Sequence, residues 1–279
     1  MLFRTFEPSP YLADFVDNLW LYEGYQAEHT NERILPSGTI ELVVNLHEDE
    51  LRIYKTDDDE RCTRFSGSVV SGPYKSGFVS DTKEEAFIMG VHFKPGGAFP
   101  FLGVPADELA DSHVDLDLLW GRTASGIRDR LLEASSPDER FRILQEALMS
   151  HISRPLEHHY AVSAALRILE RYNMPIRKLA KEVGLSERRF IQVFRSEIGM
   201  TPKAFSRVQR FQRARIFIER VEIPDWPSVA MQFGYFDQSH LIREFREFSG
   251  ASPEAYWRQH RGLIAGDVHI KTNHLPVFE

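Results

Sequence analysis

The chain has 279 residues, of which 42% are hydrophobic and 27% charged, so it is long enough for two domains that each bury a core. Its single cysteine, Cys62, excludes an internal disulfide and a cysteine-based metal cluster. No run of 18 apolar residues occurs and the first residues lack the pattern of a secretion signal, so we expect a cytoplasmic protein with no membrane partner.

The amino-terminal part of the chain has the alternating pattern of β-strands. Between Thr39 and Leu46, apolar side chains at even positions alternate with residues of mixed polarity, which predicts a half-buried strand. The acidic turn 57–60 separates two further apolar segments and predicts a hairpin with a solvated tip. Strands are predicted at 39–46, 51–55, 61–65 and 87–93.

The last of these strands ends at Pro95-Gly96-Gly97, where the glycines fit a turn and would also let a ligand approach the backbone. Beyond Val104 the apolar period becomes helical, most clearly at 137–152, with Ser136 as N-cap and Pro137 at the first position. The apolar stripe of this helix either packs into the domain core or forms a dimer seam. It consists of Phe141, Leu144, Leu148 and Ile152.

The polar residues of this part form no catalytic pattern, because none has the spacing of a metal-binding or nucleophile motif. The candidates are His47, His92, His113, Glu41 and Arg33, with the pair His158-His159 at the approach to a helix. We therefore expect no enzyme activity, no metal and no cofactor. A β-rich segment can still enclose a cavity for a small effector.

The stretch 176–253 contains one pattern written twice. The first copy is Leu179-Ala180, Gly184, Phe190, Phe194 and Gly199, and the second is Val229-Ala230, Gly234, Leu241, Phe245 and Gly250. The offset between copies is 50 residues up to the turn glycines and 51 residues after them. Two copies of one supersecondary unit are the simplest interpretation.

Each copy has the order of a helix-turn-helix unit: a short helix, a glycine at the chain reversal, and a second helix N-capped by Ser186 or Asp237. The second helix of such a unit enters the DNA major groove, so its outward polar side chains are candidate DNA contacts. They are Arg188, Arg189, Gln192 and Arg195 in the first unit, and Gln238, Ser239, His240, Arg243 and Arg246 in the second.

An amphipathic segment at 161–172 precedes the first unit and predicts a bracing helix. Between the units, the 22 residues Pro202–Ile223 would form a helix of about 33 Å, close to one DNA turn of about 34–36 Å. Such a spacer could place both units in successive major grooves. The basic residues of this helix are expected to face phosphate or solvent, and they are Lys203, Arg207, Arg210, Arg213 and Arg215.

Residues 161–261 carry 18 Lys and Arg against 11 Asp and Glu, a net charge of +7, whereas the whole chain is −7. A basic segment on an acidic protein marks the place where a polyanion would bind.

The segment from about Ala161 to Gln259 resembles the DNA-binding domain of the AraC/XylS transcription regulators. The resemblance is carried by Gly184-Leu185-Ser186, Gly199-Met200-Thr201-Pro202, Phe233-Gly234-Tyr235, Asp237-Gln238-Ser239-His240-Leu241 and Ser252-Pro253. It implies seven helices, with two helix-turn-helix units joined by a long helix. It also implies double-stranded promoter DNA and RNA polymerase as partners, and control of transcription, usually as an activator.

The resemblance places base-reading positions at Gln238, Ser239 and Arg243 in the second unit, and at Ile191 and Gln192 in the first. Ile191 can contact a thymine methyl group but cannot hydrogen-bond to guanine, so the preference of the first half-site stays open. Many members of the family have an amino-terminal cupin-like barrel that binds a small effector or forms a homodimer. Residues 1–150 are compatible with such a barrel, although they contain no cupin metal motif.

The predicted fold class is α+β: a β-rich, cupin-like barrel with helices at 1–155, an all-α double helix-turn-helix domain at 156–261, and a tail at 262–279. The leading hypothesis is a sequence-specific transcription regulator with an effector-binding or dimerisation domain. One alternative is a bifunctional DNA-modifying enzyme with this DNA-binding tail, for which Cys62 alone provides no supporting ligands. Another is an architectural protein that binds DNA without sequence preference.

Overall fold

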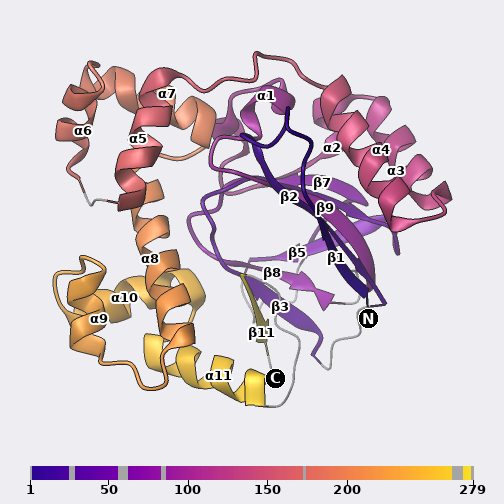
Figure 1. Ribbon diagram of the computed structural model, residues 1–279. Helices are drawn as coiled ribbons and strands as arrows, with labels where there is room; N and C mark the ends of the chain where they lie inside the picture. The colour runs from indigo at the N-terminus through magenta and orange to yellow at the C-terminus, as the bar shows by residue number, and fades with distance from the viewer. Residues whose placement is uncertain are drawn as a thin grey trace.

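The computed structural model of the protein describes residues 2–24, 29–55, 62–82, 86–171, 174–265 and 273–277. A β-rich part with two sheets lies beside a column of helices that begins with α5 (Figure 1). This arrangement confirms the predicted fold class, a β-rich amino-terminal domain followed by a helical domain.

Six antiparallel strands form the first sheet. Their order is β1 (Leu2–Phe6), β2 (Val16–Glu23), β9 (Phe87–Phe93), β4 (Glu41–Asn45), β7 (Ser68–Ser71) and β10 (His113–Asp115). The predicted strands at 39–46 and 87–93 are confirmed as β4 and β9. The alternation in β4 separates two covered faces, because Leu42 and Val44 are buried under helices while Glu41 and Val43 line an internal cavity.

Five antiparallel strands form the second sheet, and one of them comes from the other end of the chain. Their order is β11 (His274–Val277), β3 (Asn31–Ile34), β8 (Phe78–Asp81), β5 (Glu50–Tyr54) and β6 (Thr63–Ser66). The predicted hairpin is confirmed as β5 and β6, which pair antiparallel. Its acidic tip at 57–60 lies outside the described residues.

Short helices cover the outer face of the first sheet (Figure 1). They are α1 (Phe99–Leu102), the 3-10 helix η2 (Ala106–Leu109), α2 (Leu116–Trp120), α3 (Thr123–Glu133) and α4 (Pro137–Ser150). Ser136 caps α4 as predicted, because its hydroxyl accepts the Glu139 N–H at 3.3 Å. Phe141, Leu144 and Leu148 are at most 1% exposed and belong to the domain core, so the dimer-seam interpretation of this stripe is wrong.

Seven helices follow within the described part of the chain. They are α5 (Tyr160–Arg171), α6 (Ile176–Glu182), α7 (Glu187–Ile198), α8 (Pro202–Arg220), α9 (Trp226–Gln232), α10 (Gln238–Ser249) and α11 (Pro253–Ala265). The spacer helix α8 has 19 residues instead of the expected 22, and so spans about 28 Å. It ends before Pro224, which disfavours the helical conformation at the preceding residue, and the Trp257 indole N–H donates to the Val221 carbonyl at 3.2 Å.

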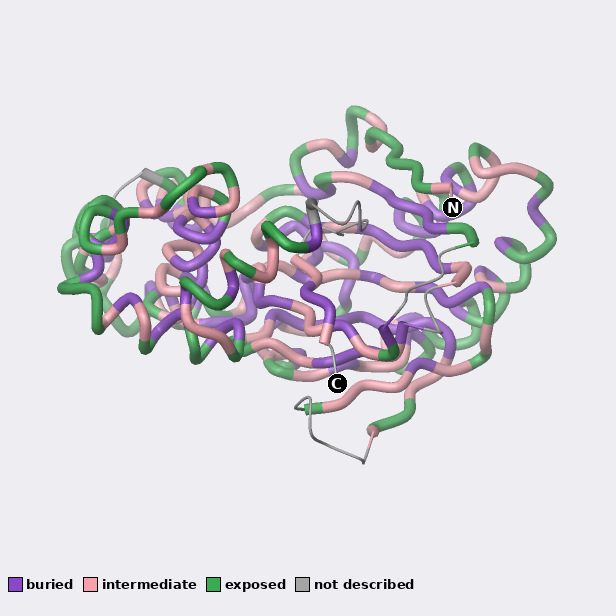
Figure 2. Tube along the Cα trace, turned by 90° about the horizontal axis from the view of Figure 1, so that it is seen from below, coloured by how far each residue is buried: buried purple, intermediate pink, exposed green. Residues whose placement is uncertain are grey.

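The expected tail returns to the amino-terminal domain, because β11 pairs with β3 over four residues. Leu275 of β11 and Leu35, which follows β3, are both buried in the core of the seven helices. In Figure 2 the buried segments follow the strands and the inner turns of the helices, and the exposed segments cover the outer turns of the helices at the left. The edge of the second sheet therefore packs directly against the helical domain.

Most arginines of α8 do not face phosphate or solvent, which corrects the expectation from the sequence. Arg207 Nε and Arg210 Nη2 donate to Oε1 of the buried Glu244 in α10 at 2.7 and 2.8 Å. Arg213 donates to a backbone carbonyl of α5 at 2.9 Å, and Arg215 is buried. These charges fix α10 and α5 against the spacer helix.

Glu244 and Glu247 both pair with Arg207, but replacing them is expected to lower the free energy of unfolding by different amounts. Glu244→Ala should destabilise the protein by about 3–5 kcal/mol, because it leaves two arginines without their buried partner. Glu247→Ala should cost at most about 1 kcal/mol, because that side chain is 49% exposed whereas Glu244 is 3% exposed. Denaturant unfolding of both variants measures the difference, and equal costs would contradict this account.

Candidate DNA interface and internal cavity

The first helix-turn-helix unit has the local structure that its sequence predicted. Gly184, between α6 and α7, has φ of +72°, in the left-handed region that glycine adopts without strain. Ser186 caps α7 by accepting the Arg189 N–H at 3.3 Å. Phe190 and Phe194 are fully buried, so the opposite face of α7 points outward.

The second unit repeats this structure with a more complete cap. Gly234 has φ of +75° at the turn, and Asp237 accepts the His240 N–H at 2.7 Å. His240 Nδ1 in turn accepts the N–H of Phe236, the residue before the cap, at 3.1 Å, so two backbone donors around the helix start are satisfied by side chains. Phe245 is fully buried and turns the polar face of α10 outward.

The candidate DNA contacts lie mostly on open surface. Arg189 donates to Gln192 Oε1 at 2.9 Å, whereas Arg188, Arg243 and Arg246 form no ion pair with any residue that the structure describes. Half-buried positions are Ile191 and His240; exposed ones are Arg188, Arg189, Gln192, Arg195, Gln238, Ser239, Arg243 and Arg246. Both recognition helices therefore present donors to a partner.

The end of α7 contacts the β-rich domain. Arg195 Nη2 lies 3.0 Å from Asp107 Oδ2 in η2, against which α7 packs. Two residues on, the buried Glu197 accepts the His159 N–H at 3.0 Å and lies 3.2 Å from His158 Nδ1. The two histidines therefore anchor the connection between domains, and Arg195 is engaged within the protein.

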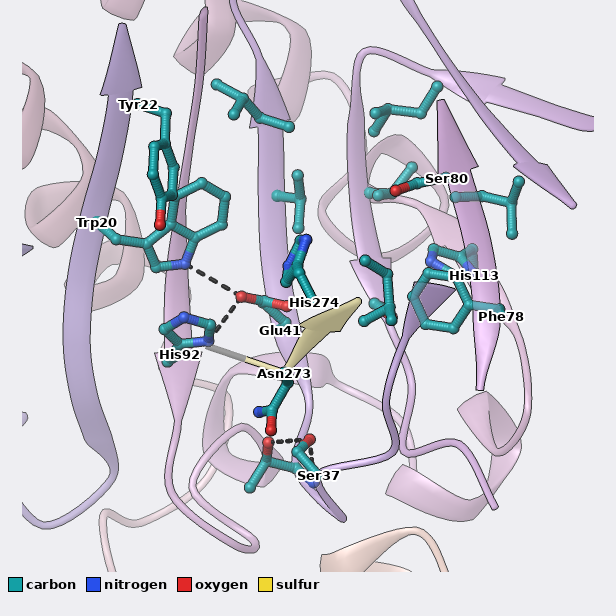
Figure 3. Close-up of a pocket in the computed structure, with 18 of the residues that line it drawn as sticks. Trp20, Tyr22, Ser37, Glu41, Phe78, Ser80, His92, His113, Asn273 and His274 are labelled. Carbon is teal, nitrogen blue, oxygen red and sulfur yellow. Dashed lines mark hydrogen bonds and ion pairs between the residues drawn. The ribbon is translucent and has the colours of Figure 1, made fainter. Parts of the chain in front are cut away.

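An internal cavity of about 520 Å³ lies between the two sheets. This volume is within the range of about 300–1,000 Å³ that small-molecule sites have. Figure 3 shows aromatic Trp20 and Tyr22 on one side of the cavity and Phe78 with His113 on the other. Strands of both sheets, including β11, contribute to the lining.

Glu41 and His92 form the charged pair of this cavity. Glu41 Oε1 accepts the Trp20 indole N–H at 3.1 Å and lies 2.6 Å from His92 Nδ1. Burial alone would raise the pKa of Glu41, but the charges of His92 and His274 together with the hydrogen bonds from His92 and Trp20 outweigh burial and lower that pKa. Burial alone would lower the pKa of His92, and the charge of Glu41 raises it instead. Both shifts favour the ionised forms of the pair.

His113 at the other side of the cavity is neutral. Burial lowers its pKa to about 4, and Nδ1 lies 2.6 Å from the Tyr74 hydroxyl. The ring also contacts Phe78 edge to face, with centroids 4.7 Å apart. His113 is thus a polar but uncharged part of the wall.

The fold brings together three of the polar residues that looked scattered in the sequence, namely Glu41, His92 and His113. It leaves His47 exposed on the surface, and it places Arg33 beside Gly250 at the end of α10. Gly96 has φ of +78° in the turn after β9, which supports the turn interpretation of these glycines. Sequence reasoning missed the lining residues Asp17, Trp20, Asn273 and His274, because their convergence depends on pairing across the whole chain.

No group of three or more His, Cys, Asp or Glu that could hold a metal ion occurs within the described ranges. None of the helices in the same ranges combines the length and apolarity needed to cross a bilayer.

Two families match the chain. Residues 179–259 match a helix-turn-helix domain, and residues 4–115 match a domain of unknown function (DUF6597). The arabinose operon regulatory protein of Escherichia coli is 29% identical over 84 residues, which are 30% of this chain and 28% of that protein. An uncharacterized HTH-type transcriptional regulator of Haemophilus influenzae is 28% identical over 81 residues, or 29% of this chain and 27% of that protein. The matched part spans little more than a quarter of each relative.

Two solved structures are similar to the chain, one over a part of its length and one over most of it. A transcriptional regulator with an AraC-type DNA-binding domain from Chromobacterium violaceum is 18% identical, with a TM-score of 0.34, over 36% of this chain and 91% of that one. ToxT from Vibrio cholerae, in an apo variant, is 11% identical, with a TM-score of 0.46, over 91% of this chain and 99% of that one.

The described features define a double helix-turn-helix DNA-binding domain that is joined to a β-rich domain with an internal cavity. Residues 179–259 form a helix-turn-helix domain of the AraC type, as the family resemblance predicted.

The neutral state of His113 predicts a specific loss of stability in acid. Its pKa lies near 4 in the folded protein and near 6.5 otherwise, so the unfolded state binds the extra proton as the pH falls from about 6.5 to about 4. This difference removes about 3 kcal/mol of stability across that window. His113→Gln, which keeps an acceptor for Tyr74, should lose less stability on acidification than the wild type.

Unfolding free energies at pH 7, 5.5 and 4 test this prediction, with His47→Gln as the control at an exposed histidine. Identical pH profiles for His113→Gln and the wild type would contradict a neutral, buried His113.

Proposed function

We propose that the protein is a sequence-specific transcription regulator that reads two successive major grooves of promoter DNA. The observation that carries this proposal is the pair of capped helices α7 and α10, whose outward faces hold exposed Arg, Gln and Ser side chains. Such side chains donate to base edges and phosphates. The net charge of +7 at residues 161–261 adds attraction that is independent of sequence.

We assign base reading in the second unit to Gln238, Ser239 and Arg243, which follow one another on the exposed face of α10. In the first unit we assign base reading to Ile191 and Gln192. Ile191 can contact a thymine methyl group but cannot read guanine, and Gln192 supplies the hydrogen-bonding groups of this unit. Arg188, Arg189 and Arg246 are assigned to phosphate, whereas Arg195 is paired with Asp107.

We propose that the β-rich domain binds a small effector in its internal cavity and catalyses no reaction. The cavity has the volume of a small-molecule site, and its walls combine aromatic rings with a few polar groups. Glu41 and His92, the groups best suited to acid–base chemistry, are paired with each other. This pairing favours a binding role, in which the polar groups orient a ligand.

The remaining parts of the functional proposal follow from promoter binding. We propose that the protein acts in the cytoplasm, activates transcription by contact with RNA polymerase, and can pair as a homodimer. We place its domains at 1–155 and 156–261, with β11 of the tail completing the second sheet of the first domain. Transcription with purified RNA polymerase, with and without the protein, tests activation against repression.

Arg243 provides the sharpest test of sequence reading. Arg243→Ala should lose about 1–3 kcal/mol of binding at one base position, if the guanidinium forms a bidentate pair with guanine. Binding to a set of operator variants, each changed at one base pair, measures this loss. The control is Arg258→Ala, which removes an exposed arginine of α11 outside the recognition helices. A uniform loss across all operator variants would mean that Arg243 contacts phosphate.

A further inference from the structure

The charge of the cavity wall points to the kind of ligand that it binds. Among the described residues that line the cavity, Asp17, Glu41 and Asp81 are acidic, and none is lysine or arginine. Glu41 is balanced by His92, and Asp81 lies 3.5 Å from Arg52. The basic side chains of the wall, His92 and His274, each pair with a carboxylate, and the charge of Asp17 also acts on His92, so the lining offers an anionic ligand no cation that is not already opposed by an acid.

The direct contacts of the Glu41 carboxylate with Trp20 and His92 involve only one of its two oxygens. The hydrogen bond from Trp20 and the ion pair with His92 are both made at Oε1, while His274 acts on the carboxylate through its charge. Figure 3 shows this carboxylate at the centre of the cavity wall, with its two dashed contacts on the side of Trp20 and His92. Oε2 can therefore accept a hydrogen bond from a ligand.

Aromatic rings surround the same end of the cavity. The Trp20 and Tyr22 rings meet edge to face at 5.8 Å, and Phe3 stacks on Tyr22 at 4.5 Å. All three line the cavity. Aromatic faces next to a carboxylate attract organic cations, because the ring quadrupole and the negative charge act in the same direction.

We propose that the cavity binds an organic ammonium compound with an aromatic or branched apolar body. The ammonium group would donate to Glu41 Oε2 and lie near Asp17, and the body would contact Trp20 and Tyr22. This inference rests on the proposed function of the cavity as an effector site, and it names the chemical class of the effector.

Matched probes that share an aromatic body and differ in the charged group test the ligand class. The full-length protein is titrated with tryptamine and phenethylamine, and with the corresponding carboxylates, indole-3-acetate and phenylacetate, by thermal shift and calorimetry. At least one amine should bind at least tenfold more tightly than its matched carboxylate. Carboxylates that bind as tightly as the amines, or a set in which no amine binds, would overturn the proposal.

Variants then locate the site. Glu41→Gln should weaken amine binding at least tenfold, and Asp17→Asn, which leaves the Glu41–His92 pair intact, should weaken it severalfold. Glu23→Gln is the control, because Glu23 is an exposed acid of β2 outside the lining. Unchanged amine affinity in Asp17→Asn and Glu41→Gln would overturn the assignment. Operator binding without any amine is measured in parallel, so a wrong ligand class is distinguishable from a wrong assignment of DNA binding.

A separate observation concerns how the cavity communicates with the DNA-binding helices. Asn273 and His274, at the start of β11, both line the cavity. Arg215 of α8 donates to Asn273 Oδ1 at 2.9 Å, and His274 Nδ1 lies 2.6 Å from Glu32 Oε2 of β3. The side chain of Asn273 thus connects the cavity to the spacer helix.

The same helix contacts the cavity rim at two more points. Gln209 and Gln212 donate to the backbone carbonyls of Ser37 and Pro36 at 2.9 and 2.7 Å. Ser37 is itself part of the lining. We propose that β11 and the segment 36–39 transmit occupancy of the cavity to α8, and through α8 to both recognition helices.

Reciprocal coupling gives a test that needs no effector. If β11 acts on the recognition helices, DNA bound to these helices must act on β11 with the same coupling energy. Hydrogen exchange of the full-length protein is measured with and without the operator that it selects. Exchange in β11 should slow at least threefold with the operator, and Asn273→Ala should remove most of this change.

Asn273→Asp provides the matched variant. Its carboxylate can still accept a hydrogen bond from Arg215, so exchange in β11 should still slow when the operator binds. Exchange in β11 that is the same with and without operator in the wild type would overturn the coupling. An equal slowing in the wild type and in Asn273→Ala would overturn the role of Asn273.

Discussion

Helix α8 is held on the edge of the second sheet by polar side chains on successive turns. Gln209, Gln212 and Arg215 reach the segment 36–37 and Asn273, which belong to the β-rich domain. Arg207 and Arg210 on the same helix hold α10 through the buried Glu244. Because a buried charge is stable only with its partner, these contacts restrict α8 to one position and thereby set the placement of both recognition helices.

The helix-turn-helix units could be predicted from the sequence because their determinants are local. Gly184 and Gly234 supply the left-handed turns, and Ser186 and Asp237 supply the caps, each within a few residues of the helix that it positions. The fold class was predicted for the same reason, since strand alternation and helical period are local patterns. The strand β4 shows the limit of such patterns, because its polar face lines a cavity instead of meeting solvent.

The rest depends on contacts between distant residues. Glu41 and His92 are neighbours only because β4 pairs with β9, and Asn273 reaches the cavity only because β11 pairs with β3. The arginines of α8 illustrate the same limit, because a basic helix next to DNA-reading units suggests phosphate contacts until their buried acidic partner is known. The apolar stripe of α4 is likewise compatible with a dimer interface or with a domain core when only the sequence is known, and the position of the neighbouring sheet decides for the core.

The central claim is that two recognition helices, fixed by one spacer helix, read DNA in a sequence-specific way. Sequencing of DNA that the full-length protein selects from a random pool tests this claim most directly. The account predicts two conserved blocks whose centres lie about one helical turn apart, roughly 10–10.5 base pairs. Enrichment without a conserved sequence, or with one block only, would contradict it.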